Sequence, residues 1–201
     1  MTAVVLAGGQ SRRMQTDKAF LEVGGKHLIE RVLDVLIPLF PEILLNSNTP
    51  ELYREWGFPV IPDVVKDKGA LGGIYSGLVH AATERSFCVA CDMPFLKTSF
   101  IKYMLERSDG CDALIPKTLD GFHPLHAIYS KQCIPAIEDL LERNRLKISK
   151  LFSVVKTRYL EEEEIRHYDP HFESFCNINT WQDLQIAREK SQKSKRAEVR
   201  R

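Results

Sequence analysis

The chain has 201 residues, of which 44% are hydrophobic, and a formal net charge of +1. This length and composition fit one domain with a complete core, and no stretch of about 18 apolar residues occurs that would predict a membrane-spanning helix. Because the N-terminus lacks the cationic and apolar segments of a secretory signal, we expect the protein in the cytoplasm.

The positive charge is concentrated at the C-terminus. Residues 188–201 contain seven Lys or Arg and two Glu, which leaves 21 of 28 basic and 25 of 27 acidic residues for the remainder. We therefore expect a single domain over residues 1–187 and a basic tail over residues 188–201 that extends the last helix or is disordered. A solvated tail is favoured over one that binds nucleic acid, and we expect neither nucleic acid nor a membrane as a partner.

Apolar runs and segments with helical spacing alternate along the chain. The apolar runs predict strands at residues 3–6, 42–45, 58–61, 86–91 and 112–115. The intervening segments predict helices at residues 26–39, 49–56, 71–83 and 99–107. The later part predicts a strand at 125–129, helices at 134–142 and 180–190, a helical turn at 147–152 and an outer strand at 153–159. This order predicts an α/β fold with a mainly parallel sheet and helices on both faces.

A glycine-rich cationic segment follows the first predicted strand and reads Leu6-Ala7-Gly8-Gly9-Gln10-Ser11-Arg12-Arg13-Met14-Gln15-Thr16-Asp17-Lys18. Adjacent glycines let backbone N–H groups approach a phosphate, and Arg and Lys add charge-assisted hydrogen bonds. The alternative is a tight turn with solvated charges, which the complete segment makes less favoured. The segment is neither a P-loop nor a dinucleotide-binding fingerprint, because it lacks the residues that close either pattern.

Polar residues follow three other predicted strands. Asn46, Asp63 and Asp92 each come directly after an apolar run or close behind it. One such residue is an ordinary turn former or helix cap, but ligands of parallel sheets bind beyond the carboxyl ends of the strands. Asp92 is a candidate Mg²⁺ ligand, since this ion takes one or two carboxylates together with water and phosphate oxygens. Capping of the following helix is the alternative role for Asp92.

These motifs resemble those of the nucleotidyltransferase superfamily and, within it, the molybdenum cofactor guanylyltransferase (MobA) family. The first segment resembles Leu-Ala-Gly-Gly-x-Ser-x-Arg-Met-Gly-x-Asp-Lys, with Gln15 where the family has glycine. The segment from Cys91 to Pro94 resembles Cys-Asp-x-Pro, whose Asp holds the metal. Residues 69–74 resemble Gly-Pro-Leu-Ala-Gly, with alanine in place of proline, and residues 177–180 resemble a late Asn-x-Asn-Thr. The resemblance implies a three-layer Rossmann-like nucleotidyltransferase fold.

The resemblance also implies a reaction: transfer of GMP from Mg-GTP to the phosphate of molybdopterin, with release of pyrophosphate. The implied catalytic residues are Arg13, Lys18 and Asp92, with Mg²⁺ on Asp92. The implied nucleotide-binding residues are Leu6, Ala7, Gly8, Gly9, Lys18, Asn46, Asp63 and Asp92. Contact with the acceptor is expected from His123, Asn177 and Asn179. Implied partners are GTP and molybdopterin, together with molybdoenzymes or other proteins of cofactor biosynthesis.

Other functions stay open at this point. A related nucleotidyltransferase would use CTP or a sugar-phosphate acceptor, and a non-catalytic domain would bind the nucleotide alone. A nicotinamide oxidoreductase is disfavoured because its glycine pattern is missing. The late Asn-x-Asn-Thr segment is also compatible with a simple turn and helix cap.

Three further patterns favour structural roles. Cys88 and Cys91 form a C-x-x-C, but side chains three apart on a strand point to opposite faces, which disfavours a shared metal or disulfide. The five cysteines as a set fit a reducing compartment. Pro124 and the absence of nearby ligands argue against a metal site at His123 and His126. The acidic run at residues 161–164 is typical of a solvated helix start.

Overall fold

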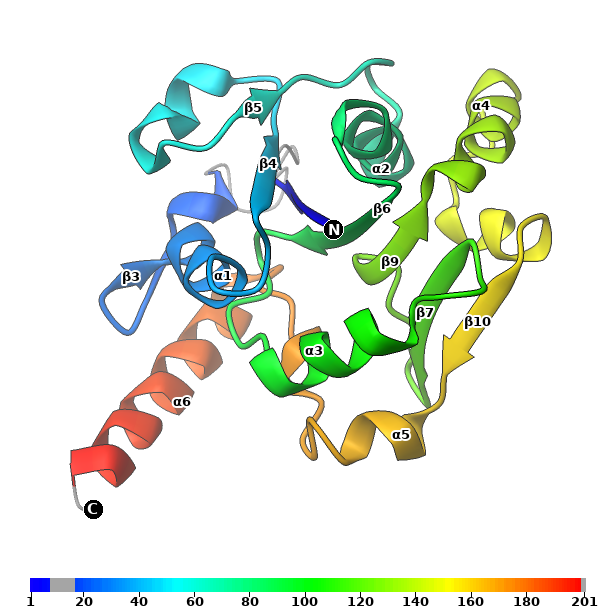
Figure 1. The fold of residues 1–201 in the computed structure, drawn as a ribbon. Coiled ribbons are helices and arrows are strands. Elements are labelled where there is room, and N and C mark those ends of the chain that lie inside the picture. Colours follow the sequence, from blue (N-terminus) through cyan, green and yellow to red (C-terminus); the bar gives the residue numbers. More distant parts are fainter. Residues whose placement is uncertain (8–16, 200–201) are drawn as a thin grey trace.

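The structure is a computed structural model that describes residues 1–7 and 17–199, apart from the side chains of residues 194–199. A mainly parallel sheet forms its centre (Figure 1). In spatial order its strands are β10 (Thr157–Leu160), β7 (Ala113–Thr118), β9 (His126–Ser130), β6 (Arg85–Ala90), β1 (Thr2–Leu6), β4 (Glu42–Asn46) and β5 (Val60–Ile61). Only β9 runs antiparallel to its neighbours along this path, and β8 (Gly121–Phe122) forms a short hairpin with β7. The predicted α/β fold class is confirmed.

Helices cover both faces of the sheet (Figure 1). One face packs against α1 (Leu28–Leu36), α3 (Thr98–Arg107) and α5 (Glu162–Arg166), and the other against α2 (Gly69–His80) and α4 (Ile134–Glu142). The alternation of strand side chains explains this division, since Ala3 and Val5 join the first core and Val4 joins the second. Gly77 lets α2 approach β1, because a Cβ there would lie 2.6 Å from Val4 Cγ1.

Cys88 and Cys91 lie in the two cores as predicted, whereas Cys176 is exposed. Cys88 packs on the α2 and α4 side and Cys91 on the α1 and α3 side, so the C-x-x-C pair points to opposite faces. All five cysteines are free thiols. The acidic run at residues 161–164 begins α5, where Glu161 is the N-cap, which confirms its role as a helix start.

Short elements depart from the sequence prediction. The predicted helix over residues 26–39 begins only at Leu28, because β2 (Glu22–Val23) and β3 (Lys26–His27) form a hairpin whose turn residues Gly24 and Gly25 have φ of 67° and 82°. Single-turn 3₁₀ helices are η1 (Lys18–Phe20), η3 (Lys131–Cys133) and η5 (Glu173–Phe175), and longer ones are η2 (Pro50–Trp56) and η4 (Ile148–Ser153).

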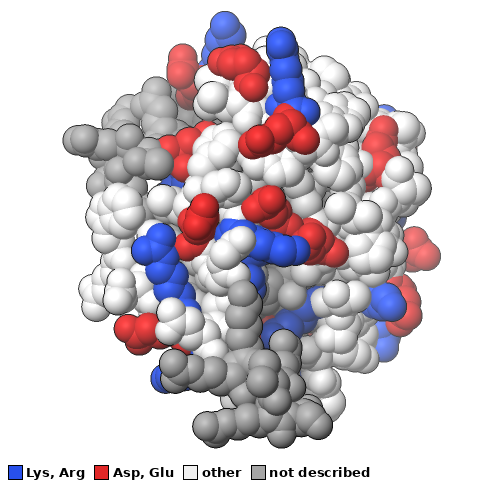
Figure 2. Space-filling view, turned by 90° about the vertical axis from the view of Figure 1, so that its left-hand side faces the viewer, with Lys and Arg blue, Asp and Glu red and all other residues white. Residues whose placement is uncertain are grey.

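The last helix, α6 (Trp181–Val199), extends away from the sheet (Figure 1) and continues into the basic C-terminal segment. On the face shown in Figure 2, basic and acidic side chains are interspersed, so the described residues form no extended patch of one sign there. No helix of the described ranges is both long and apolar enough to cross a membrane.

Candidate active site

A cavity of about 610 Å³ opens at the carboxyl ends of β1, β4, β5 and β6. It brings together most of the site residues predicted from sequence that the structure describes: Leu6, Ala7, Lys18, Asn46, Asp63, Asp92, Asn177 and Asn179. The register of the parallel strands explains this convergence, because β1 pairs with β4 on one side and β6 on the other. Gly8, Gly9 and Arg13 lie outside the described residues.

Lys18 links the segment after β6 to the segment before α6. Its Nζ lies 3.0 Å from Asp92 Oδ2 and 2.6 Å from Asn179 Oδ1. Both Lys18 and Asp92 are mostly buried, with side chains 18% and 14% exposed. Asp92 follows β6 after one intervening residue, Cys91, and it does not cap the next helix, because the N-cap of α3 is Lys97. The alternative capping role for Asp92 is therefore wrong, and its carboxylate is available to the cavity.

Two oxygen atoms of the cavity are buried without a hydrogen-bond partner among the described residues: Asp92 Oδ1 and Asn177 Oδ1. The Ile178 backbone N–H donates to the Asp92 carbonyl at 3.0 Å, which holds the two segments side by side. A buried carboxylate oxygen without a partner is costly, and a cation relieves that cost. Carboxylate and amide oxygens are also the donors that Mg²⁺ accepts. The residues present therefore fit this metal, with phosphate and water supplying its other ligands.

The wall beyond β4 and β5 is a closed set of hydrogen bonds. Asn46 Nδ2 donates to Asp63 Oδ1 at 3.0 Å, Asn48 Nδ2 donates to Asp63 Oδ2 at 2.8 Å, and the Asp63 N–H donates to Asn48 Oδ1 at 2.9 Å. Helix α2 passes close by, since a Cβ at Gly73 would lie 2.7 Å from Asn46 Oδ1. Hydrogen bonds within this wall thus hold its amide and carboxylate groups at the cavity.

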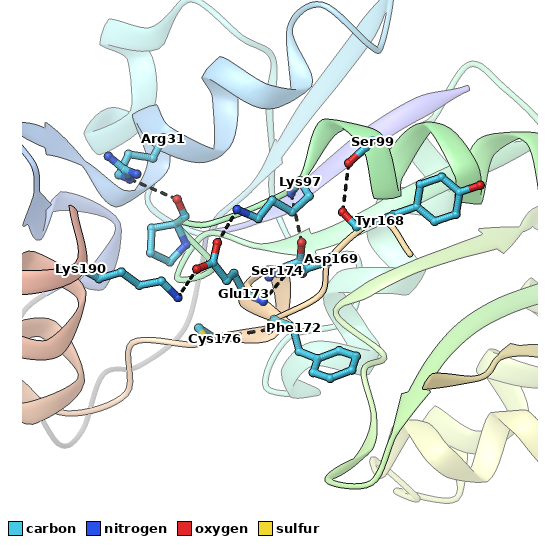
Figure 3. A network of polar contacts seen from close by, with 11 residues as sticks. Arg31, Lys97, Ser99, Tyr168, Asp169, Phe172, Glu173, Ser174, Cys176 and Lys190 are labelled. Atoms are coloured by element: carbon cyan, nitrogen blue, oxygen red, sulfur yellow. Dashed lines mark hydrogen bonds and ion pairs between the residues drawn. The ribbon is translucent and has the colours of Figure 1, made fainter. Parts of the chain in front are cut away.

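The segment that carries Asn177 is fixed by a polar network (Figure 3). The buried Asp169 carboxylate accepts hydrogen bonds from the backbone N–H groups of Glu173 (3.0 Å) and Ser174 (2.8 Å). Figure 3 shows the Glu173 carboxylate between Lys97 and Lys190, both of which it pairs with. Burial raises the pKa of Glu173, but hydrogen bonds from the two lysines outweigh it and bring that pKa below its usual value. This network ties α3 and α6 to the segment.

His123 does not line this cavity, contrary to expectation. Its Nε2 lies 2.8 Å from Thr118 Oγ1, and its ring stacks on Phe175 with the centroids 3.8 Å apart. Burial lowers the pKa of His123, which favours the neutral imidazole. Because β9 runs antiparallel to β6, the residues before β9 reach the same edge of the sheet, and Leu125 lines the cavity, but the His123 ring contacts Thr118 and Phe175 instead. The ring supports Phe175, two residues before Asn177, and contact with the acceptor stays a prediction.

The Asn-x-Asn-Thr segment at residues 177–180 has two roles, helix capping by Thr180 and lining of the cavity by the asparagines. Thr180 Oγ1 accepts a hydrogen bond from the Asp183 N–H (3.1 Å), and Asp183 Oδ2 accepts one from the Thr180 N–H (2.8 Å). This reciprocal pair caps the start of α6. Asn177 and Asn179 instead line the cavity. The motif is therefore both a helix start and part of the site.

Several lining residues were not assigned a role from the sequence: Asp17, Asn48, Asp67, Gly69, Ala70, Gly73 and Leu125. Asn48 had a signal, because it lies two positions after Asn46 beyond the same strand. Leu125 had none in the sequence, since its place depends on β9 pairing with β6.

Comparison with known proteins gives a consistent result. The family model of MobA-like NTP transferase domains matches residues 3–160. A probable molybdenum cofactor guanylyltransferase from Pelotomaculum thermopropionicum is 39% identical, covering 98% of this chain and 97% of the relative. A molybdenum cofactor guanylyltransferase from Syntrophotalea carbinolica is 40% identical, covering 92% of this chain and 89% of the relative.

A solved structure has the same fold. The crystal structure of molybdopterin-guanine dinucleotide biosynthesis protein A from Archaeoglobus fulgidus superposes with a TM-score of 0.86 at 31% identity, covering 96% of this chain and all of that one. The fold, the cavity residues and the near-complete alignments agree. The chain belongs to the family of MobA-like NTP transferases.

Proposed function

We propose that this protein is a molybdenum cofactor guanylyltransferase, which transfers GMP from Mg-GTP to the phosphate of molybdopterin and releases pyrophosphate. The observation that carries the proposal is the Lys18–Asp92 pair at 3.0 Å within one cavity that also contains Asn177 and Asn179. The named relatives supply the choice of base and acceptor.

Asp92 Oδ1 would hold Mg²⁺, and Asn177 Oδ1 is a second oxygen in the same cavity without a partner among the described residues. When bound, the ion supplies neutralisation of charge on the reacting phosphates. Lys18 places a positive charge beside this position, and the release of Lys18 from Asp92 leaves its ammonium free to bind phosphate oxygens. Arg13, outside the described residues, is proposed as a further cation for the leaving pyrophosphate.

Attack on the α-phosphate requires no covalent bond to the enzyme, so catalysis depends on alignment of the two substrates and on charge neutralisation. Asn46 and Asp63 form a prearranged set of acceptors and donors for the nucleotide. Asn177 and Asn179 lie across the cavity and orient the acceptor phosphate. Proteins that donate or receive the cofactor, among them molybdoenzymes, remain proposed partners.

The test is pyrophosphate release by the purified protein with molybdopterin, Mg²⁺ and each of GTP, CTP, ATP and UTP in turn. Turnover with GTP alone supports the proposal. Turnover with CTP alone would make the protein a cytidylyltransferase, and turnover only with a sugar phosphate as acceptor would make it a sugar-nucleotide pyrophosphorylase. Nucleotide binding without turnover on any acceptor would favour a non-catalytic binding domain.

A further inference from the structure

Tyr53 contacts the cavity wall from behind. It is fully buried on η2, between β4 and β5, and it is not a lining residue. Its hydroxyl lies 2.6 Å from the Ala7 carbonyl oxygen and 2.7 Å from Asp17 Oδ2. Ala7 and Asp17 both line the cavity. One hydroxyl proton is therefore shared between two acceptors that belong to the site.

Asp17 links this hydroxyl to Lys18. The Oδ1 atom of Asp17 accepts a hydrogen bond from the Ala19 N–H at 3.1 Å and so caps η1, whose first residue is Lys18. The other carboxylate oxygen is the one bound by Tyr53. The direction of the Lys18 side chain thus depends on a carboxylate that Tyr53 holds in place.

The Tyr53 ring and its hydroxyl have separable tasks. The ring packs against Phe20 and Trp56, with centroids 5.5 Å and 5.7 Å away, and this packing needs no oxygen. Burial first, and the hydrogen bond to Asp17 second, raise the pKa of Tyr53 well above its usual value, so the hydroxyl remains a donor throughout the working pH range. A phenylalanine at this position would keep the ring and remove only the contact with the cavity wall.

We infer that Tyr53 is a positioning residue for nucleotide binding: its hydroxyl holds the Ala7 carbonyl and the Asp17 carboxylate and thereby sets the position of the Lys18 ammonium. The inference rests on the proposed function only in that Lys18 contacts the phosphates of the nucleotide. Tyr53 thus joins the residues that determine nucleotide affinity, although it does not line the cavity.

The experiment is a double-mutant cycle with Tyr53→Phe and Lys18→Met, read as the dissociation constant of Mg-GTP measured by titration. We expect Tyr53→Phe to weaken Mg-GTP binding about fivefold to tenfold in the wild-type background, which corresponds to the loss of one hydrogen bond. In the Lys18→Met background the same substitution should weaken binding less than about twofold. In steady state the KM for GTP should rise while the KM for molybdopterin stays unchanged. An equal effect in both backgrounds, or no effect in either, would overturn the inference.

Tyr103→Phe is the matched control. Its hydroxyl also binds a carboxylate, Glu164 Oε1 at 2.7 Å, and neither residue lines the cavity, so nucleotide affinity should not change. If Tyr53→Phe does not fold, Asp17→Ala replaces it, because it removes the carboxylate oxygen that accepts the Tyr53 hydrogen bond. Failure of this variant to weaken binding would equally refute the inference. Binding is measured without an acceptor, so a protein that binds GTP but does not turn over would refute the proposed function and leave this cycle decisive.

Discussion

The two walls of the cavity differ in how their polar atoms are satisfied before a ligand arrives. In the first wall, Asn46, Asn48 and Asp63 bond to one another. In the second wall, Asp92 and Asn177 each keep a buried oxygen without a partner among the described residues. Polar groups that already bond to one another hold fixed positions for recognition of a ligand. Buried oxygens without a partner instead gain their interactions when the cation and substrate bind.

The two walls also differ in how far apart their residues lie along the sequence. The first wall lies on adjacent parallel strands, and Asn46 and Asp63 are only 17 residues apart. The second wall joins segments from across the chain, since Lys18 is 74 residues from Asp92 and 161 from Asn179. Positions of the second wall are therefore set by the whole fold, and its buried oxygens are maintained by packing around them.

The largest effect is expected from removing the charge of the second wall. Asp92→Asn keeps the shape of the side chain but loses the carboxylate that would hold Mg²⁺ and pair with Lys18. We expect kcat to fall by about a thousandfold, as in other sites that lose a charge-stabilising group, with higher Mg²⁺ needed for half-maximal rate. The measurement is the initial rate of pyrophosphate release over a Mg²⁺ series.

Asp63→Asn is the control for that experiment, because it removes a carboxylate of similar size from the first wall. We expect its main effect in the KM for the nucleotide, with kcat nearly retained. Equal losses of kcat in the two variants would refute the division of labour between the walls.

A pair of apolar substitutions compares the walls by stability. Asn177→Leu removes a buried oxygen for which the described part of the chain offers no hydrogen-bond partner, so the free energy of unfolding should stay equal or rise while activity falls about tenfold to a hundredfold. Asn46→Leu removes the partner of Asp63 and should lower the free energy of unfolding by about 1–3 kcal/mol. Urea unfolding without ligands measures both, and a marked destabilisation by Asn177→Leu would contradict the comparison.

The first wall was largely predictable from the sequence. Asn46 and Asp63 each follow an apolar run, and the parallel pairing of β4 with β5 brings the carboxyl ends of these runs together. The bounds of the helices were less certain, because the two-residue strands of the β2–β3 hairpin are too short for a periodic signal. In the sequence, the Gly24-Gly25 pair is the local feature that indicates the turn of this hairpin.

The second wall needed the fold. The resemblance identified Asn177 and Asn179, but nothing local showed that Lys18 would contact both Asp92 and Asn179. His123 lies outside the cavity lining because its side chain contacts Thr118 and Phe175, and no local pattern indicates these contacts. The sequence does not indicate the role of Tyr53, because a tyrosine in a short helix is compatible with simple core packing. Its hydrogen bonds to Ala7 and Asp17 are known only from the structure.

The stability of the protein should depend on pH through His126, which packs against Phe175 near the second wall. His126 is fully buried between Phe100 and Phe175, and burial lowers its pKa to about 3, whereas an unfolded histidine titrates near 6.5. Between these values the unfolded chain binds the proton and the native protein does not, so stability falls as the pH drops below about 6.5. We expect His126→Phe to remove a slope of about 1.4 kcal/mol per pH unit in this range.

The measurement is the free energy of unfolding of wild type and His126→Phe from pH 7 to pH 5, a range in which carboxylates contribute little. His123 contributes in the same direction, since burial lowers its pKa as well, so a shallower slope remains in the variant. Identical slopes in the two proteins would show that His126 does not control the acid response.

The smallest effect is expected where α6 is tied to the second wall. Glu173→Gln keeps the hydrogen-bonding shape but weakens both lysine pairs, and we expect a loss of about 1 kcal/mol in the free energy of unfolding at pH 7. Because the folded pKa of Glu173 lies below its unfolded value, this contribution is complete above the unfolded pKa and disappears as the pH falls through the folded one.

Asp139→Asn provides the comparison on a solvated helix face, since its partner Arg143 and Asp139 itself are both more than half exposed. Exposed pairs of this kind contribute at most about 0.5 kcal/mol, because water screens the charges and side-chain freedom is lost. The difference between the two variants therefore measures what the partial burial of Glu173 adds, and urea unfolding of both at pH 7 and pH 4 determines it. If Glu173→Gln costs no more than Asp139→Asn, then Asp169 and the Phe175 packing hold the Asn177 segment without help from the charges.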